Sequence, residues 1–170
     1  NFMTCNNGIE TIPPLDYIES IYLNLLHSHH SFVNTSIDFH YNLLSKNHLL
    51  ITKATFDRIL NNLLSNALEA MGHNGKIWIY SENIQKFERL FTRFTIGNNH
   101  SYIEESLIEK IFEMGFSSGK KNGSGIGLFG VRKFIEKHGG MIFCRSSKEI
   151  GVEFIFDIPS VNSEINKKKI

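Results

Sequence analysis

The chain has 170 residues and a formal net charge of +1, and 41% of its residues are hydrophobic while 21% are charged. These values are typical of one globular domain that can bury a sizeable core. The small net charge predicts no acidic partner, and no basic stripe supports binding to nucleic acid. No apolar run approaches the roughly 18 residues that cross a bilayer, so no membrane contact is expected for this chain.

The cysteine content indicates a compartment. Cys5 and Cys144 are far apart and fit no metal-binding or redox spacing, which favours a reduced, cytoplasmic protein. The chain begins at Asn1, with its first methionine at Met3, and we interpret it as a fragment of a longer protein. The parent protein can therefore be membrane-anchored, although this chain has no apolar span.

The first part of the chain is predicted to alternate between helices and strands. Residues 1–14, which contain Asn-Asn-Gly and Pro-Pro breakers, are expected to form an irregular segment or a linker from a missing dimerisation region. A helix is expected at Leu15–His27 and a strand at Ser36–Leu44, where apolar residues alternate. A short strand at His48–Thr52 precedes the strongest helix, Ala54–Met71, whose apolar residues recur at helical spacing.

The rest of the chain is predicted to hold two pairs of strands, a short helix, a polar loop and a longer helix. The strand pairs are expected at Lys76–Glu82 with Phe87–Ile96, and at Met141–Arg145 with Val152–Ile158. The short helix is expected at Ile103–Phe112, the mobile loop at Glu113–Gly123, and the longer helix from there to about His138. This mixture predicts an α/β (α+β) two-layer sandwich, with helices on one face of a mixed, mostly antiparallel sheet. The domain is expected to span residues 15–160, followed by a polar tail at 161–170.

Two asparagines lie four residues apart on the strongest predicted helix, in the run Asn62-Leu63-Leu64-Ser65-Asn66-Ala67. At this spacing the side-chain amides of Asn62 and Asn66 share one face of the helix. An amide oxygen suits Mg²⁺, which prefers oxygen ligands and keeps phosphates and waters in its shell. The pattern is equally compatible with polar residues on the solvent face of an amphipathic helix, so it needs support from a second motif.

A glycine-rich run, Gly123-Ser124-Gly125-Ile126-Gly127-Leu128, joins the polar loop to the helix that follows. Glycines let a backbone approach phosphates, and the first turn of a helix offers free N–H groups to an anion. Lys120 and Lys121 precede the run and are well placed to meet a triphosphate. The run follows a loop rather than a strand, and no Lys-Ser or Lys-Thr follows it, so it is neither a dinucleotide fingerprint nor a P-loop. The alternative is a flexible loop that ends in a helix cap.

Taken in this order, the two motifs resemble those of the histidine kinase catalytic domain, in the superfamily that also holds gyrase, the chaperone Hsp90 and MutL. The N box of that family is similar to Asn62–Ala67 and its G2 box is similar to Gly123–Leu128. Its F box is similar to Ile111-Phe112-Glu113 followed by Phe116. The resemblance covers roughly residues 15–160 and implies a Bergerat-type ATP-binding fold.

The resemblance also implies ligands, partners and residue roles. Asn66 would ligate Mg²⁺, Asn62 would support the triphosphate of ATP, and Glu113–Gly123 would be the ATP lid. The remaining nucleotide-binding residues would be Lys120, Lys121, Gly123, Ser124, Gly125, Ile126, Gly127 and Leu128. The γ-phosphate would pass to a histidine on a dimerisation helix absent from this chain, and from there to an aspartate of a response-regulator receiver domain.

The G1 box departs from the family pattern. The family usually shows Asp-x-Gly-x-Gly after a strand, and the aspartate accepts a hydrogen bond from the adenine amino group. Here the stretch is Asn98-Asn99-His100-Ser101-Tyr102, so the acid is an amide and both glycines are replaced. An amide oxygen also accepts hydrogen bonds. We therefore expect Asn98 to be the main polar reader of adenine, with weaker binding than an aspartate would give.

Three classes of function remain open: a histidine kinase, an ATPase or serine kinase of the same superfamily, and a degenerate nucleotide-binding or regulatory module. In the ATPases and serine kinases of the superfamily a glutamate base occupies the position of Asn62, and an amide cannot take a proton near neutral pH. A histidine acceptor needs less help, because neutral imidazole is already nucleophilic. This favours the histidine kinase, while the altered G1 box keeps the degenerate module open. No histidine of the chain stands in an acceptor motif, so the isolated chain is expected not to phosphorylate itself.

Overall fold

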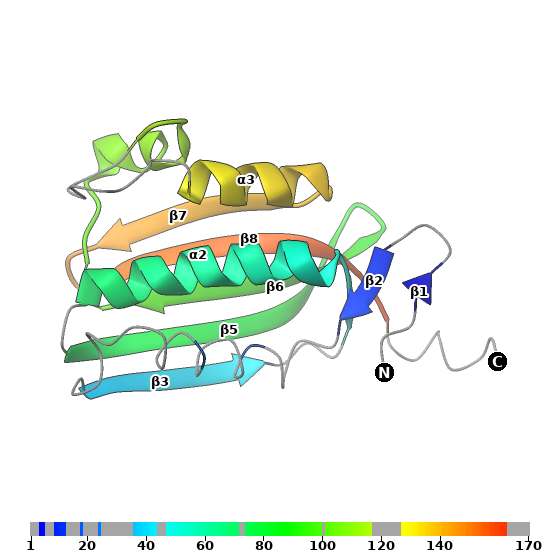
Figure 1. Cartoon of the computed structure of the whole chain (residues 1–170), viewed down its shortest axis with the longest axis horizontal. Coiled ribbons are helices and arrows are strands. Elements are labelled where there is room, and N and C mark those ends of the chain that lie inside the picture. The colour runs from blue at the N-terminus through cyan, green and yellow to red at the C-terminus, as the bar shows by residue number, and fades with distance from the viewer. Residues whose placement is uncertain are drawn as a thin grey trace.

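The computed structural model has helices on one face of a twisted sheet, the two-layer α/β arrangement expected from the sequence (Figure 1). The structure describes residues 4–5, 9–12, 18, 24, 36–43, 47–71, 74–99, 101–116 and 127–162. Among these residues no helix is both long enough and apolar enough to span a bilayer.

The sheet is mixed but mostly antiparallel, as predicted. Its strands are β1 (Thr4–Cys5), β2 (Ile9–Ile12), β3 (Ser36–Leu43), β4 (His48–Leu50), β5 (Asn74–Lys86), β6 (Arg89–Asn98), β7 (Met141–Ser147) and β8 (Gly151–Val161). They follow the order β1-β2-β4-β8-β6-β5-β3, and β7 also pairs with β8. The pair β3–β5 is parallel, whereas β5–β6, β6–β8 and β7–β8 are antiparallel.

Helix α2 (Lys53–Met71) covers the sheet because its apolar residues recur every three or four positions. Thr52 caps its start: the Thr52 Oγ1 atom accepts a hydrogen bond from the Thr55 backbone N–H at 3.2 Å. The α2 residues buried in the core are Phe56, Ile59, Leu60, Leu63, Leu64, Ala67, Leu68 and Met71.

Helix α3 (Gly127–Lys137) lies beside α2 on the same face of the sheet (Figure 1). It buries Val131 and Ile135, and the Gly140 backbone N–H closes its end by donating to the Ile135 carbonyl at 3.0 Å. The helix expected at Leu15–His27 lies outside the described residues except for Ile18 and Asn24. Both of these are helical, and Ile18 is buried in the common core.

Alternation along the strands separates two faces of the sheet. Ile77, Ile79, Phe94, Ile96 and Phe156 point toward the helices and are almost fully buried. Their strand neighbours point to the opposite face, where Tyr80 and Phe143 are partly exposed. The described core therefore lies between the sheet and its helices. Helix-facing residues at the ends of the strands lie at the edge of this core.

Several element boundaries differ from the sequence-based expectation. The β5–β6 turn falls at Phe87 and Glu88, which both have positive φ, so Phe87 is not the first residue of a strand as predicted. The expected helix at Ile103–Phe112 is instead two 3₁₀ turns, η2 (Glu105–Leu107) and η3 (Lys110–Phe112). Residues 9–12 of the supposedly irregular segment form β2, because the edge of β4 offers unpaired backbone groups to them.

Candidate nucleotide site

Asn62 and Asn66 lie on the C-terminal half of α2, and both are half-buried. The Asn62 Nδ2 atom donates to the Arg58 carbonyl at 2.7 Å, which fixes the direction of its side chain. A Cβ atom at Gly127 would lie only 3.0 Å from the Asn62 Oδ1 atom. The first residue of α3 therefore approaches Asn62 closely because it has no side chain.

This contact brings together one end of each motif found in the sequence. Gly127 and Leu128 are described, and Leu128 packs half-buried against the core. Six other candidate residues lie outside the described part of the chain: Lys120, Lys121, Gly123, Ser124, Gly125 and Ile126. The geometry of the candidate site therefore comes from α2, the start of α3 and the G1 segment.

Asn98 is the last residue of β6 and lies on the helix-facing side of the sheet. It pairs with Ile77 of β5 and Val152 of β8, both of which are buried, and its own exposure is 3%. Its Oδ1 atom accepts a hydrogen bond from the Ser101 hydroxyl at 2.7 Å. The end of β6, the C-terminal end of α2 and the start of α3 lie at the same end of the molecule (Figure 1).

The segment after Asn98 is tied to two strands. Asn99 accepts the Lys76 backbone N–H at its Oδ1 atom, at 2.8 Å, and its own backbone N–H donates to the Lys76 carbonyl at 3.3 Å. The Ile103 N–H donates to the Ser146 hydroxyl of β7 at 2.9 Å. These bonds hold the altered G1 segment between the start of β5 and the edge of β7.

The F-box residues are anchored to α3 and to β8. Phe112 is 3% exposed and meets the ring of Phe154 edge-on, with centroids 6.2 Å apart. The guanidinium carbon of Arg132 in α3 lies 5.7 Å from the Phe112 ring centroid. One cation–π contact therefore joins the F-box candidate to the helix that follows the glycine-rich motif.

The donor set of the candidate site is neutral. Among the described residues, no three His, Cys, Asp or Glu side chains gather in a way that could hold a metal ion. Asn62 and Asn66 instead offer amide oxygens on α2, and that of Asn62 lies beside the first residue of α3. Such a set fits a hard cation that takes its remaining ligands from phosphates and water, as Mg²⁺ does.

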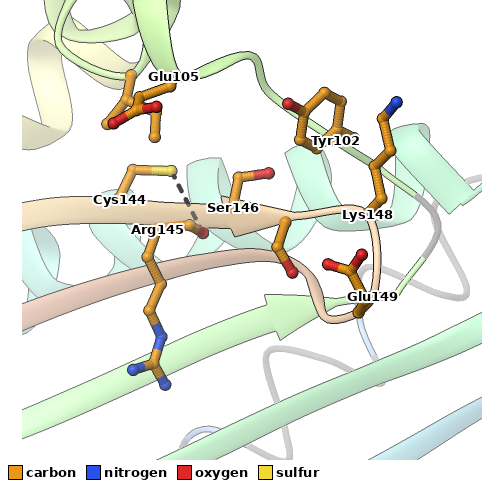
Figure 2. A pocket seen from close by; sticks show the side chains of 9 residues that line it. Tyr102, Glu105, Cys144, Arg145, Ser146, Lys148 and Glu149 are labelled. Atoms are coloured by element: carbon orange, nitrogen blue, oxygen red, sulfur yellow. Dashed lines mark hydrogen bonds between the residues drawn. The ribbon is translucent and has the colours of Figure 1, made fainter.

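A cavity of about 530 Å³ lies behind the G1 segment and was not foreseen from the sequence. It is lined by Tyr102, η2 and the β7–β8 turn, and the Lys148 Nζ atom lies 5.6 Å from the Tyr102 ring centroid (Figure 2). Cys144 and Ser146 point toward η2, whereas Arg145 points to the other side of the strand. Burial, with smaller contributions from Glu109 and Glu153, raises the pKa of the Cys144 thiol to about 12, so this thiol stays protonated at neutral pH.

Comparisons with known proteins identify a family and similar solved structures. Residues 52–162 match the family described as histidine kinase-, DNA gyrase B-, and HSP90-like ATPase. The nucleotide-free catalytic domain of histidine kinase ThkA is similar, with a TM-score of 0.74 and 32% identity, over 95% of this chain and 99% of that chain. ThkA in complex with the response regulator protein TrrA is 30% identical, with a TM-score of 0.70, over 90% of this chain and 42% of that chain.

One similar protein is much longer than this chain. The sensor protein FixL of Bradyrhizobium diazoefficiens is 27% identical over 114 residues, which are 67% of this chain and 22% of FixL. The chain spans about a fifth of the length of this curated relative, so the similarity concerns one part of FixL.

Proposed function

We propose that this chain, which belongs to the family of histidine kinase-, DNA gyrase B- and HSP90-like ATPases, is the Mg-ATP-binding catalytic domain of a two-component sensor histidine kinase. The observation that carries the proposal is the close approach of Asn62 and Gly127. It joins the asparagine motif of α2 to the end of the glycine-rich motif at the start of α3. The 32% identity to the ThkA catalytic domain over nearly the whole chain supports the same function.

The residues of this chain would bind and orient the nucleotide. Asn66 would hold Mg²⁺ through its side-chain oxygen, and Asn62 beside it would support the triphosphate. The backbone N–H groups at the start of α3 would face the phosphates. Lys120, Lys121 and the glycine-rich residues before Gly127 are assigned from the sequence motif alone. When bound, Mg²⁺ would neutralise negative charge on the phosphates during phosphoryl transfer.

The phosphoryl acceptor would be a histidine on a dimerisation helix outside this chain. A bond forms between the γ-phosphorus and an imidazole nitrogen, the bond from the γ-phosphorus to the β–γ bridging oxygen breaks, and ADP leaves. Neutral imidazole needs no general base, and the amide of Asn62 cannot act as one. The phosphoryl group would then pass to a response-regulator aspartate, a partner suggested by the complex of ThkA with TrrA. Such chemistry would place the domain in the cytoplasm.

One observation favours a second candidate, a nucleotide-binding regulatory module without phosphoryl transfer. Asn98 stands where the family usually has an aspartate, and its Oδ1 atom already accepts the Ser101 hydroxyl. A side-chain amide oxygen accepts hydrogen bonds as a carboxylate oxygen does, so Asn98 would offer the adenine amino group a neutral acceptor. Adenine binding would then persist with a neutral rather than a charge-assisted bond.

Titration calorimetry with ATP, with and without Mg²⁺, tests the proposed site. The wild type is expected to bind Mg-ATP more tightly than ATP alone, and Asn66→Ala should remove most of that difference without unfolding the protein. Asn61→Ala is the matched control, because Asn61 is exposed on the same helix and belongs to neither motif. Equal Mg²⁺-dependent affinity in wild type and Asn66→Ala would exclude Asn66 as a ligand.

A phosphoryl-transfer assay separates the two candidate functions. The isolated chain should not label itself from ATP, whereas adding a histidine-bearing dimerisation segment should give acid-labile phosphohistidine. Mg-ATP binding without any transfer to that segment would favour the regulatory module. Steady ATP hydrolysis by the isolated chain, at rates typical of a dedicated ATPase, would contradict the interpretation of Asn62.

A further inference from the structure

We propose that Trp78, Glu153 and Arg145 are positioning residues for Asn98: they form a brace on the opposite face of the sheet that fixes the end of β6 behind the nucleotide site. The inference rests on the proposed function, because it assigns these residues an effect on nucleotide affinity. None of the three belongs to the N, G1, F or G2 box.

The brace is a row of side chains that crosses four strands. Register places Trp78 of β5 opposite Gly97 of β6, Gly97 opposite Glu153 of β8, and Glu153 opposite Arg145 of β7. The Trp78 Nε1–H donates to the Glu153 Oε1 atom at 2.9 Å, and the Arg145 Nε–H donates to Glu153 Oε2. The carboxylate of Glu153 is 7% exposed, so one buried acid joins the two outer strands of the row.

Gly97 is where the brace touches the backbone that carries Asn98. A Cβ atom at Gly97 would lie 2.6 Å from the Trp78 Nε1 atom, so the indole occupies the space that any side chain at this position would need. The indole therefore lies directly over the peptide that precedes Asn98. Glu153, by holding the indole N–H, keeps the ring in that position.

Strand β8, which also pairs with the end of β6, lies close to the backbone of Asn98. Gly151 has a φ of +100°, and a Cβ atom there would collide with the carbonyl oxygen of Asn98. Since Val152 pairs with Asn98 and Glu153 pairs with Gly97, a shift of β8 would move both residues at the end of β6. The side chain of Asn98 is 3% exposed, so its direction is set by this backbone.

The chain contains a matched control on the same strand and face. Asp157 lies four residues beyond Glu153 and, like Glu153, is a buried carboxylate. Its two partners are cations, Lys86 at 2.7 Å and Arg93 at 2.8 Å. Asp157 pairs with Arg93, which precedes Asn98 by five residues, or about 16 Å along an extended strand. Loss of Asp157 should therefore disturb the sheet without disturbing Asn98.

The experiment compares Glu153→Gln with Asp157→Asn by calorimetric titration with Mg-ATP and by thermal unfolding. Both variants should unfold at lower temperature, but Glu153→Gln should also weaken Mg-ATP binding by about threefold or more, the size expected of coupling within one network. Trp78 is the single tryptophan of the chain, so its fluorescence reports directly on the brace. Its emission should change in Glu153→Gln and stay constant in Asp157→Asn.

Milder variants cover the case in which Glu153→Gln fails to fold. Arg145 has a 64% exposed side chain, so Arg145→Gln should fold, and it should weaken Mg-ATP binding in the same direction. Arg145→Lys keeps the charge and should restore most of the affinity. A purely structural role would lower stability without this rescue of affinity.

The brace is refuted if Glu153→Gln and Arg145→Gln both bind Mg-ATP as tightly as wild type, or if Asp157→Asn weakens binding equally. In those cases the proposed function survives provided that wild type binds Mg-ATP more tightly than ATP alone and Asn66→Ala removes most of that difference. A wild type that binds no nucleotide would overturn both the brace and the proposed function.

Discussion

Replacing Asp157 by asparagine should destabilise the domain by a predictable amount. The side chain of Asp157 is fully buried, and it accepts hydrogen bonds from Lys86 Nζ at 2.7 Å and from Arg93 Nε and Nη2 at 2.8 and 3.0 Å. Removing one partner of a buried ion pair typically costs about 3–5 kcal/mol, because the remaining charge loses its partner. The two cations here are 29% and 26% exposed, so water would compensate part of this loss.

We therefore expect the free energy of unfolding to fall by about 2–3 kcal/mol in Asp157→Asn, just below that range. For a domain of this size, about 1 kcal/mol lowers the melting temperature by roughly 2–4 °C, so the fall should be about 5–10 °C. Circular dichroism during thermal unfolding at pH 7 measures it. A variant that melts with the wild type would show that the network contributes no net stability.

The same variant has a characteristic pH dependence. Burial alone would raise the pKa of Asp157, but the hydrogen bonds from Arg93 and Lys86 outweigh it and hold that pKa below its usual value of 3.8. A carboxyl whose pKa is lower in the folded state stabilises the fold above its unfolded pKa and loses this contribution as the pH falls through the folded pKa. The stability gap between wild type and Asp157→Asn should thus be constant from pH 7 to about pH 5 and shrink below pH 3.8. A gap of unchanged size at pH 3 would contradict the assigned ionisation.

Three further predictions concern the nucleotide site. Gly127→Ala should weaken Mg-ATP binding several-fold, because its Cβ would lie 3.0 Å from the Asn62 Oδ1 atom. Gly130→Ala is the control, since its Cβ would meet Phe134 at 4.0 Å. It should leave the calorimetric affinity for Mg-ATP unchanged and raise the free energy of unfolding by up to about 1 kcal/mol. Asn98→Asp should tighten ATP binding by about fivefold and sharpen the preference for ATP over GTP, since a charge-assisted bond replaces a neutral one; unchanged affinities would mean that Asn98 does not read the base. A non-hydrolysable ATP analogue should slow amide hydrogen exchange across residues 114–123, and exchange that is equally slow without nucleotide would contradict their assignment as an ATP lid.

The helices and the sheet class could be predicted because their signals are local. The apolar residues of Ala54–Met71 repeat at helical spacing, and the structure has α2 at Lys53–Met71. The turn at Phe87 and Glu88 was missed for a physical reason: turns with positive φ at both central residues usually contain glycine or asparagine, and neither residue gives that signal. Their left-handed conformation is imposed by the long pairing of β5 with β6, which no local pattern reveals.

The candidate site divides in the same way. The spacing of Asn62 and Asn66 indicates that both amides share a helix face, and the structure places them on α2 as expected. The approach of Gly127 to Asn62 depends on the packing of α3 against α2. The order of the motifs suggests that they meet in one site, but it does not predict which residues come into contact. The row of Trp78, Gly97 and Glu153 was not foreseen, because cross-strand neighbours are set by register and a shift of one residue would move every side chain to the other face.

The altered G1 segment is restrained by contacts that its own side chains and those of β7 and the β7–β8 turn supply. Glycines at positions 100 and 102 would leave the segment conformationally free, so ordering it on a nucleotide would cost entropy. Here the Ser101 hydroxyl holds Asn98, the Ser146 hydroxyl holds the backbone of Ile103, and the ammonium group of Lys148 lies over the Tyr102 ring. These contacts restrain the segment, so less freedom would remain to be lost on binding adenine. In the proposed site, the neutral amide would weaken the direct bond to the base, whereas the restrained segment would reduce the entropic cost of making it, so the two effects on affinity would oppose each other.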